Sequence, residues 1–354
     1  DQSLEQALRA RITGEVRFDA GSRALYATDG SNYRMPPIGV VIPRSREDVI
    51  ATVATAREFG VPILSRGGGT SLAGQCCNTA VIIDFSKYLN RILELDPVAR
   101  IARVEPGIVL DDLRNAAEAH GLTFGPDPAT HQWCTLGGMI GNNSCGVHSV
   151  MAGRTVDNIE ALEVLLYDGT ILRVGAGDHA IEHLSGGSPE RATALGKALR
   201  AIAADYGAEI HRMFPDIPRR VSGYSIDQLL DEHGFHVARA LVGSEGTLVT
   251  TLEATVRLIP SPRSRVLVVA GFTDMAIAGD LVPTILSHGP IGLEAMDRRL
   301  TNAMEKKRLH PRELAQLPQG DAWVLAEFGA ETPSLATEQA RRLDEQRHSN
   351  DEPT

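Results

Sequence analysis

The stretch that most constrains the fold of this chain is Arg66–Gly74, which reads Arg-Gly-Gly-Gly-Thr-Ser-Leu-Ala-Gly and follows a short apolar run, Val61–Leu64, that predicts a strand. Three consecutive glycines let the backbone adopt positive φ angles and turn successive N–H groups into one concavity. Such a concavity suits a pyrophosphate, for which Arg66 would supply charge and the hydroxyls of Thr70 and Ser71 further donors. The absence of Gly-Lys-Ser/Thr excludes a Walker loop, and the spacing disfavours a Rossmann fold. A glycine-rich turn without a ligand is the alternative.

A second glycine-rich segment, Thr135–Gly146, favours the ligand-binding interpretation. Pro126 and Pro128 fix the backbone that leads to it. Its glycines allow close packing against a flat ligand, while Asn142–Ser144 offers polar groups to the edge of a ring. Two further turn-rich segments follow at Gly153–Asn158 and Val242–Leu248.

Length and composition predict a folded protein of two domains. The chain has 354 residues, of which 43% are hydrophobic and 23% charged, which is enough for two cores. The net charge of −10 argues against a nucleic-acid partner, since binding phosphates requires clustered Lys and Arg. No apolar run is long enough for a transmembrane segment, and no leader opens the chain at Asp1. We therefore expect a cytoplasmic protein, with peripheral attachment to the inner membrane as the alternative.

Four cysteines, Cys76, Cys77, Cys134 and Cys145, form no Cys-x-x-Cys pair. Zinc and iron–sulfur spacings are therefore absent, and the sequence predicts no metal site. Reduced thiols are the expected state.

The order of elements predicts an α/β or α+β fold that is divided at Pro260–Pro262, where prolines interrupt the pattern. Before this point we expect helices at Arg46–Phe59, Val109–His120 and Ser188–Tyr206, and strands at Val81–Asp84, Ile101–Val104, Leu241–Val242 and Leu248–Leu258. A hairpin of Ile159–Tyr167 with Thr170–Val174 is expected across a type I′ Asp168-Gly169 turn. Beyond it we expect strands at Val266–Phe272, Ile291–Met296 and Ala322–Phe328, helices at Met275–Ser287, Arg298–Lys307 and Ser334–Arg347, and a polar tail at His348–Thr354.

These motifs, taken in order, resemble the FAD-linked oxidases of the vanillyl-alcohol-oxidase or p-cresol methylhydroxylase type. Within that superfamily the chain is similar to the glycolate oxidase, D-lactate dehydrogenase and D-2-hydroxyglutarate dehydrogenase branch, in its long bacterial form. The matching segments are Val41–Pro43, Arg66–Gly74, Val104–Gly107, Pro126–Pro128, Thr135–Gly146 and Gly243–Thr247. Several independent motifs in one order are far more specific than any one alone.

The resemblance implies an α+β fold in which residues 1–262 form a two-part FAD-binding domain of the p-cresol methylhydroxylase type. Residues 263–354 would form the beginning of a cap, or substrate, domain that is incomplete. The residues implied in FAD binding are Pro43, Arg66, Gly67, Gly68, Gly69, Thr70, Ser71, Gly74, Pro126, Asp127, Thr135, Gly138, Asn142, Asn143, Ser144, Gly146, Gly153, Ile159, Glu245 and Gly246. Some relatives attach FAD through a histidine that closes the first loop. Thr70 occupies that position here, so we expect non-covalent FAD.

The chain departs from the family pattern after the cap domain begins. It lacks the Gly-His-x-Gly-Asp-Gly segment that supplies metal ligands and a candidate base in this branch, and it lacks the iron–sulfur cysteines of the long members. We therefore expect the front portion of a longer enzyme, with any iron–sulfur cluster in the missing C-terminal part.

The implied reaction is hydride transfer from a D-2-hydroxy acid of the D-lactate, glycolate or D-2-hydroxyglutarate class to the flavin; the electron acceptor is not implied. In the resembling enzymes an arginine ahead of a Thr/Ser-Gly-Tyr segment grips the substrate carboxylate, and both Arg219 and Arg220 fit that position. Tyr224 is a candidate hydrogen-bond donor or a packing residue. His148 is a candidate near the reacting centre or a structural histidine.

Two other interpretations remain open. The chain could be a non-catalytic FAD-binding module or a fragment of a larger iron–sulfur flavoprotein. It could also act on an alcohol or a sugar with the same cofactor scaffold.

Overall fold

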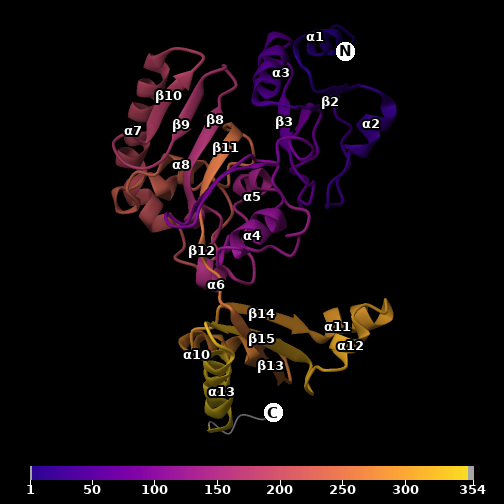
Figure 1. The fold of residues 1–354 in the computed structure, drawn as a ribbon, viewed down its shortest axis with the longest axis vertical. Helices are drawn as coiled ribbons and strands as arrows, with labels where there is room; N and C mark the ends of the chain where they lie inside the picture. Colours follow the sequence, from indigo (N-terminus) through magenta and orange to yellow (C-terminus); the bar gives the residue numbers. More distant parts are fainter. Residues whose placement is uncertain (1, 350–354) are drawn as a thin grey trace. The chain divides into compact units, whose positions relative to one another are not determined.

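The computed structural model describes residues 2–349, which form two compact units (Figure 1). The first unit comprises residues 2–145 and 153–259, and the second comprises residues 146–152 and 260–349. The last five residues of the polar tail expected at His348–Thr354 lie outside the described residues. Within residues 2–349 every helix is too short or too polar to cross a membrane.

One part of the first unit is a four-stranded sheet with the order β1-β2-β4-β3. Its strands are β1 (Glu15–Arg17), β2 (Gly39–Ile42), β3 (Ile63–Arg66) and β4 (Val81–Asp84). The central strands β2 and β4 are parallel and fully buried, as expected of a sheet covered on both faces. The helices of this part are α1 (Gln2–Arg11), α2 (Ala20–Leu25) and α3 (Arg46–Glu58).

The predicted helix at Arg46–Phe59 is confirmed as α3. The helix begins there because the side chain of Ser45 accepts a hydrogen bond from the backbone N–H of Asp48 and caps the first turn. The strand expected at Val61–Leu64 lies two residues later, as β3. Val61 instead donates its N–H to Ala56 at the end of α3, and Pro62 has no N–H to give to a sheet. This shift makes β3 run directly into the first glycine loop.

The other part of the first unit is a six-stranded antiparallel sheet with the order β10-β9-β8-β11-β6-β5. Its strands are β5 (Ile92–Asp96), β6 (Ile101–Val104), β8 (Ile159–Leu165), β9 (Ile171–Val174), β10 (Ile181–Ser185) and β11 (Thr250–Arg257), and β7 (Leu122–Thr123) and β12 (Ile259–Pro260) are two-residue strands outside it. Its helices are α4 (Leu110–Glu118), α5 (Leu136–Asn142), α7 (Pro189–Met213) and α8 (Val237–Leu241), with short 3₁₀ turns at Val156–Asn158, Ile226–Leu229 and Asp231–His233. Side chains from this sheet and these helices share the largest apolar core of the molecule.

The hairpin of β8 and β9 is confirmed, but its predicted type I′ turn is wrong. Gly169 has a φ of 93°, whereas Asp168 is not in the positive-φ region that a type I′ turn requires. Gly169 donates its N–H to Leu166, and Leu166 donates to Thr170. The connection is therefore a type I turn followed by a left-handed glycine, which adds one residue to the loop.

The strand predicted at Leu241–Val242 is also wrong, because Leu241 is the last residue of α8. His236 caps this helix: its ring accepts a hydrogen bond from the backbone N–H of Arg239. Two apolar residues carry no periodicity, so the sequence could not distinguish a buried helix from a strand here.

The second unit is built on a three-stranded antiparallel sheet with the order β13-β15-β14. Its strands are β13 (Ser264–Phe272), β14 (Gly292–Asp297) and β15 (Ala322–Ala330), and its helices are α6 (Ser149–Ala152), α9 (Met275–Asp280), α10 (Val282–Ser287), α11 (Arg298–Lys306), α12 (Pro311–Leu314) and α13 (Pro333–Ser349). Alternate residues of β15, from Ala322 to Phe328, face a core that includes Ile285 and Leu343. The single helix expected at Met275–Ser287 is two helices, since Pro283 in the first turn of α10 cannot continue the hydrogen bonds of α9.

Candidate functional site

The two glycine loops, which are far apart in the sequence, are in direct contact in the first unit. A β-carbon on Gly67 would stand 1.9 Å from Oγ1 of Thr135, and one on Gly68 would stand 2.1 Å from the carbonyl oxygen of Trp133. Gly69 adopts a positive φ of 66°, which favours glycine. The glycine triplet is therefore required both by its turn and by its neighbour.

The second loop takes its shape from α5 and from the residues that follow Gly153. Thr135 caps α5 by accepting a hydrogen bond from the N–H of Gly138. The helix ends at Asn143, a buried residue in the left-handed region, whose Oδ1 accepts a bond of 3.0 Å from the N–H of Val156. The carbonyl of Ser144 accepts two bonds from the N–H and hydroxyl of Thr155. These contacts hold the polar residues of the loop in one conformation.

A third segment, the turn at Gly243–Gly246, packs against α5. Gly243 donates its N–H to Ile140 and Glu245 donates to Gly141, each over 2.9 Å. Gly243, Glu245 and Gly246 all have positive φ angles, of which the 52° of Glu245 is unfavourable for a residue with a side chain. A non-glycine residue held in this region is a feature typical of functional sites.

These three segments, together with Val221–Tyr224, line a cavity of about 720 Å³ in the first unit, which we call the principal cavity. Twelve of the sequence-predicted residues line it: Gly67, Gly68, Gly69, Thr70, Ser71, Thr135, Gly138, Asn142, Asn143, Ser144, Tyr224 and Glu245. An adjoining cavity is lined by Arg66 and Gly246 and by several of the same residues. Gly74 lines a further depression, which also reaches Glu245.

The principal cavity is lined almost entirely by neutral groups. Glu245 is the one carboxylic acid among its lining residues, and none of them is Lys or Arg. Burial raises the pKa of the Glu245 carboxyl, which accepts a hydrogen bond of 3.3 Å from Gln75. Burial also raises the pKa of the Cys134 thiol to about 11, so that thiol is protonated at neutral pH.

The guanidinium of Arg66 serves the loop rather than the cavity. It donates to the carbonyl oxygens of Thr28 (2.8 Å), Cys76 (3.1 Å) and Tyr26 (3.3 Å) and lies over the Tyr26 ring. A β-carbon on Gly69 would stand 2.5 Å from Nη2 of Arg66. Arg66 therefore braces the segments on either side of the first loop.

Six of the predicted cofactor residues line neither the principal cavity, nor the adjoining cavity, nor the depression beside Gly74. They are Pro43, Pro126, Asp127, Gly146, Gly153 and Ile159. Pro43, Pro126 and Ile159 are buried. Gly146 belongs to the second unit.

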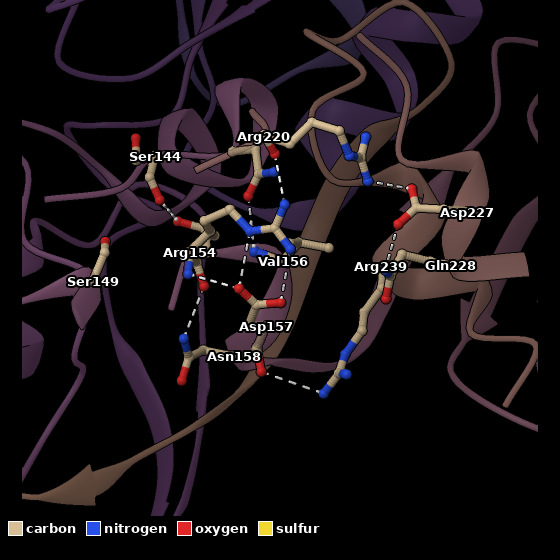
Figure 2. A network of polar contacts seen from close by, with 12 residues as sticks. Ser144, Ser149, Arg154, Val156, Asp157, Asn158, Arg220, Asp227, Gln228 and Arg239 are labelled. Atoms are coloured by element: carbon tan, nitrogen blue, oxygen red, sulfur yellow. Dashed lines mark hydrogen bonds and ion pairs between the residues drawn. The ribbon is translucent and has the colours of Figure 1, made fainter. Parts of the chain in front are cut away.

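The structure places the two candidate arginines in different surroundings, and Figure 2 shows those of Arg220. Nη2 of Arg220 lies 2.6 Å from Oδ1 of Asp227, with side chains that are only 15% and 14% exposed, and the guanidinium stacks on Phe214. Arg219 is exposed and, within the described part of the chain, makes no ion pair. Tyr224 is 46% exposed at the wall of the principal cavity, where its hydroxyl lies 2.8 Å from Oγ1 of Thr247.

The remaining catalytic candidate, His148, belongs to the second unit. Its Nε2 lies 3.1 Å from Oε2 of Glu327 on β15, and its side chain is buried. A β-carbon on Gly292 of β14 would stand 3.4 Å from its ring. His148 thus fixes the segment Gly146–Ala152 to the sheet of the second unit.

Sequence reasoning missed Arg154, Asp157 and Asp227. Arg154 pairs with Asp157 and donates a hydrogen bond to the backbone carbonyl of Arg220, and Asp227 pairs with the Arg220 side chain. The spacing of Arg154 and Asp157, three residues apart, is a signal that could have indicated a local pair. No comparable signal marks the pairing of Arg220 with Asp227 across an irregular segment.

The lining of the principal cavity fits FAD. Glycines that cannot accept a β-carbon leave room for a pyrophosphate beside the Thr70 and Ser71 hydroxyls, and neutral donors bind such an anion without a neighbouring lysine. The amides of Asn142 and Asn143 lie on another wall of the same cavity.

Comparison with protein families identifies both units. Residues 37–175 match the FAD binding domain family, and residues 261–352 match the C-terminal domain of FAD linked oxidases.

The similar curated proteins include dehydrogenases and an oxidase subunit named for three different 2-hydroxy acids. The chain is 32% identical over 301 residues to a D-2-hydroxyglutarate dehydrogenase of Pseudomonas putida, which covers 84% of this chain and 30% of that protein. It is 30% identical to the glycolate oxidase subunit GlcD of Escherichia coli, over 86% of this chain and 52% of the relative. It is also 30% identical to a D-lactate dehydrogenase of Archaeoglobus fulgidus, over 81% of this chain and 51% of the relative. The chain thus spans about a third to a half of the length of these relatives.

Solved structures show the same fold at low identity. An alkyldihydroxyacetonephosphate synthase matches 99% of this chain and 60% of its own with a TM-score of 0.67 and 18% identity. The 6-hydroxy-D-nicotine oxidase of Arthrobacter nicotinovorans matches 94% of this chain and 59% of its own with a TM-score of 0.58 and 17% identity. The predicted α+β fold of the vanillyl-alcohol-oxidase type is confirmed. By the two matching domains and the curated relatives, the chain belongs to the FAD-linked oxidases.

Proposed function

We propose that this chain binds FAD and a D-2-hydroxy acid of the D-lactate, glycolate or D-2-hydroxyglutarate class, as part of a dehydrogenase that transfers hydride from the acid to the flavin. The observation that carries the proposal is the principal cavity, because the two glycine loops and the segment Val221–Tyr224 share it. The cofactor loops and the segment that follows the candidate carboxylate-binding arginine therefore line one space. The names of the relatives support the choice of substrate class.

In this proposal Gly67–Ser71 binds the pyrophosphate and Asn142–Ser144 lies at the flavin ring. FAD is held without a covalent bond, since Thr70 stands where a histidine would form one. We assign residues 1–262 to the FAD-binding domain and 263–354 to the beginning of the substrate domain, a division supported by the family match that starts at residue 261.

The substrate would be held by Arg219 and Tyr224. Arg219 is the better candidate for the carboxylate, because Arg220 is already paired with Asp227 and stacked on Phe214. A planar guanidinium binds a carboxylate through two parallel hydrogen bonds. The hydroxyl of Thr247 donates to the carbonyl of Ser244, so the Tyr224 hydroxyl donates to Thr247 and can donate to a substrate oxygen instead. Bound FAD supplies the hydride acceptor.

The remaining parts of the proposal concern what lies outside this chain. Any iron–sulfur cluster would be held by other residues of a longer protein, because the four cysteines here lack the spacing of such a site. We place the protein in the bacterial cytoplasm by its resemblance to the long bacterial members, and we name no electron acceptor.

An anaerobic absorption spectrum of the FAD-loaded chain tests the proposal. D-lactate, glycolate and D-2-hydroxyglutarate are added in turn, with L-lactate as the control of stereochemistry. Loss of the oxidised flavin bands with at least one of the three acids is the expected result. Flavin bands that remain unchanged with all three would contradict the proposal and favour a non-catalytic FAD-binding module, an alternative supported by the partial coverage of the relatives.

A further inference from the structure

Arg154 joins two segments of the principal cavity without lining it. Its guanidinium donates to both carboxylate oxygens of Asp157, over 3.0 and 3.1 Å, and its Nη1 donates to the backbone carbonyl of Arg220 over 2.6 Å (Figure 2). The Arg154 side chain is only 14% exposed. A guanidinium that is shielded from water and oriented by a bidentate pair with a carboxylate donates strong and directional hydrogen bonds.

On one side, Arg154 is attached to the second glycine loop. Thr155 and Val156, which follow it, bind the carbonyl of Ser144 and the side chain of Asn143. Gly153 makes the turn before it possible: its φ is 69°, and a β-carbon there would stand 2.6 Å from Asp157. The position of the Arg154 guanidinium is therefore set by the loop that contributes Asn142–Ser144 to the cavity.

On the other side, Arg154 fixes the beginning of the segment Arg219–Tyr224. The Arg220 side chain is anchored to Asp227, and its carbonyl is anchored to Arg154. The end of the segment lies close to Gly243, where a β-carbon would stand 3.1 Å from the carbonyl oxygen of Gly223. Arg219 precedes the anchored carbonyl directly, so any displacement of that carbonyl displaces Arg219.

We propose that Arg154 is a positioning residue for the 2-hydroxy acid, because it holds Arg219 and Tyr224 at a fixed place relative to the flavin-binding loop. This inference rests on the proposed function. Arg154 lines neither the principal cavity nor the adjoining one, so its assigned role is to hold other residues in place. Its removal is expected to loosen the segment Arg219–Tyr224 and to leave the FAD loops intact.

The test compares Arg154→Gln and Arg154→Lys with the control Arg103→Gln, which removes an ion pair with Glu253 between β6 and β11. The first measurement is limited trypsin digestion of the FAD-loaded chain, since cleavage after Arg219 or Arg220 requires the segment to leave its anchored position. We expect Arg154→Gln to be cleaved there about tenfold faster than the wild type, and Arg103→Gln at the wild-type rate.

The second measurement separates positioning from a general loss of structure. For Arg154→Gln we expect the KM for the hydroxy acid to rise about tenfold, kcat to change by less than about threefold, and the FAD content to stay at the wild-type level. Arg154→Lys retains one donor and is expected to fall between Arg154→Gln and the wild type.

Three outcomes would overturn the inference. Cleavage at the wild-type rate in Arg154→Gln would show that the bridge does not hold the segment. Faster cleavage of Arg154→Gln together with a KM for the hydroxy acid equal to that of the wild type would show that the bridge does not position the substrate. A wild-type chain whose flavin no 2-hydroxy acid reduces would contradict the proposed function itself, and the trypsin comparison would then decide the structural role of Arg154 on its own.

Discussion

A β-carbon on Gly67 would stand 1.9 Å from Oγ1 of Thr135, so these two residues adjoin with no space for a side chain between them. Gly67 begins the triplet that follows β3, and Thr135 caps α5 in the other part of the first unit. Their contact joins the two glycine loops into one wall of the principal cavity. The FAD site therefore depends on the close approach of two segments that belong to different sheets and their helices.

Replacement of Gly67 by Ala is expected to weaken FAD binding by at least about tenfold. The added methyl group must push Thr135 and the start of α5 away, at a cost of about 1–3 kcal/mol. Gly279→Ala in α9 of the second unit is the matched control, because a β-carbon there also meets nothing within 4 Å. Flavin fluorescence during titration measures both affinities, and equal FAD affinity for the two variants would show that the contact is not required.

Replacement of Arg219 and of Arg220 by Met is expected to have different consequences. Arg219→Met should weaken binding of the hydroxy acid by roughly 10- to 100-fold with little change in stability, since the exposed guanidinium has no ion pair among the described residues. Arg220→Met leaves the Asp227 carboxylate without its partner and should lower the free energy of unfolding by on the order of 3 kcal/mol. Substrate titration and urea unfolding of both variants distinguish the two roles. Weaker binding of the hydroxy acid in Arg220→Met, with loss of stability in Arg219→Met, would assign binding of the substrate carboxylate to Arg220.

Protonation of His236 is expected to destabilise the protein as the pH falls. Burial lowers the pKa of His236 to about 4 from its usual 6.5, and its ring nitrogen must be unprotonated to accept the N–H of Arg239. Between pH 6.5 and 4 the unfolded chain therefore binds a proton that the folded chain does not. The free energy of unfolding should fall in this window by at most about 1.4 kcal/mol per pH unit from this residue.

His236→Asn tests this expectation, because an asparagine oxygen can cap α8 in place of the ring nitrogen and does not titrate. The pH dependence of urea unfolding between pH 7 and pH 4 should be shallower for His236→Asn than for the wild type. Parallel curves for the two proteins would contradict the assigned pKa.

We expect FAD to be bound without a covalent link, because Thr70 stands where some relatives carry the linking histidine. Acid precipitation of the flavin-loaded chain should leave all the flavin in the supernatant, and the pelleted protein should show no flavin fluorescence in a denaturing gel. Flavin that stays with the precipitated chain would show a covalent link at another residue.

Local patterns in the sequence predicted much of the fold. The strands at Val81–Asp84 and Ile101–Val104 match β4 and β6, because short β-branched runs bounded by turn residues are typical of buried strands. Ser45 correctly marked the start of α3. Both glycine loops were identified individually, since consecutive glycines have few other uses in a folded chain.

Long-range pairings could not be predicted. Nothing near Arg220 in the sequence indicates that its guanidinium binds Asp227 or that its carbonyl binds Arg154. Arg66 illustrates the same limit, because its charge suggested a phosphate contact while its guanidinium binds three backbone carbonyls. An arginine's partners are set by tertiary structure, so its type alone does not assign its role.

Titration of the flavin-free chain with FAD and with FMN tests the central claim, that the two glycine loops form one site for a flavin dinucleotide. FMN carries the same ring but lacks the second phosphate and the adenosine. We predict one FAD per chain and an affinity for FMN at least about 100-fold weaker. The hydrogen-bond donors of Gly67–Ser71 would meet a single phosphate of FMN in place of the pyrophosphate of FAD. Equal binding of FAD and FMN, or no saturable binding of FAD, would contradict the account.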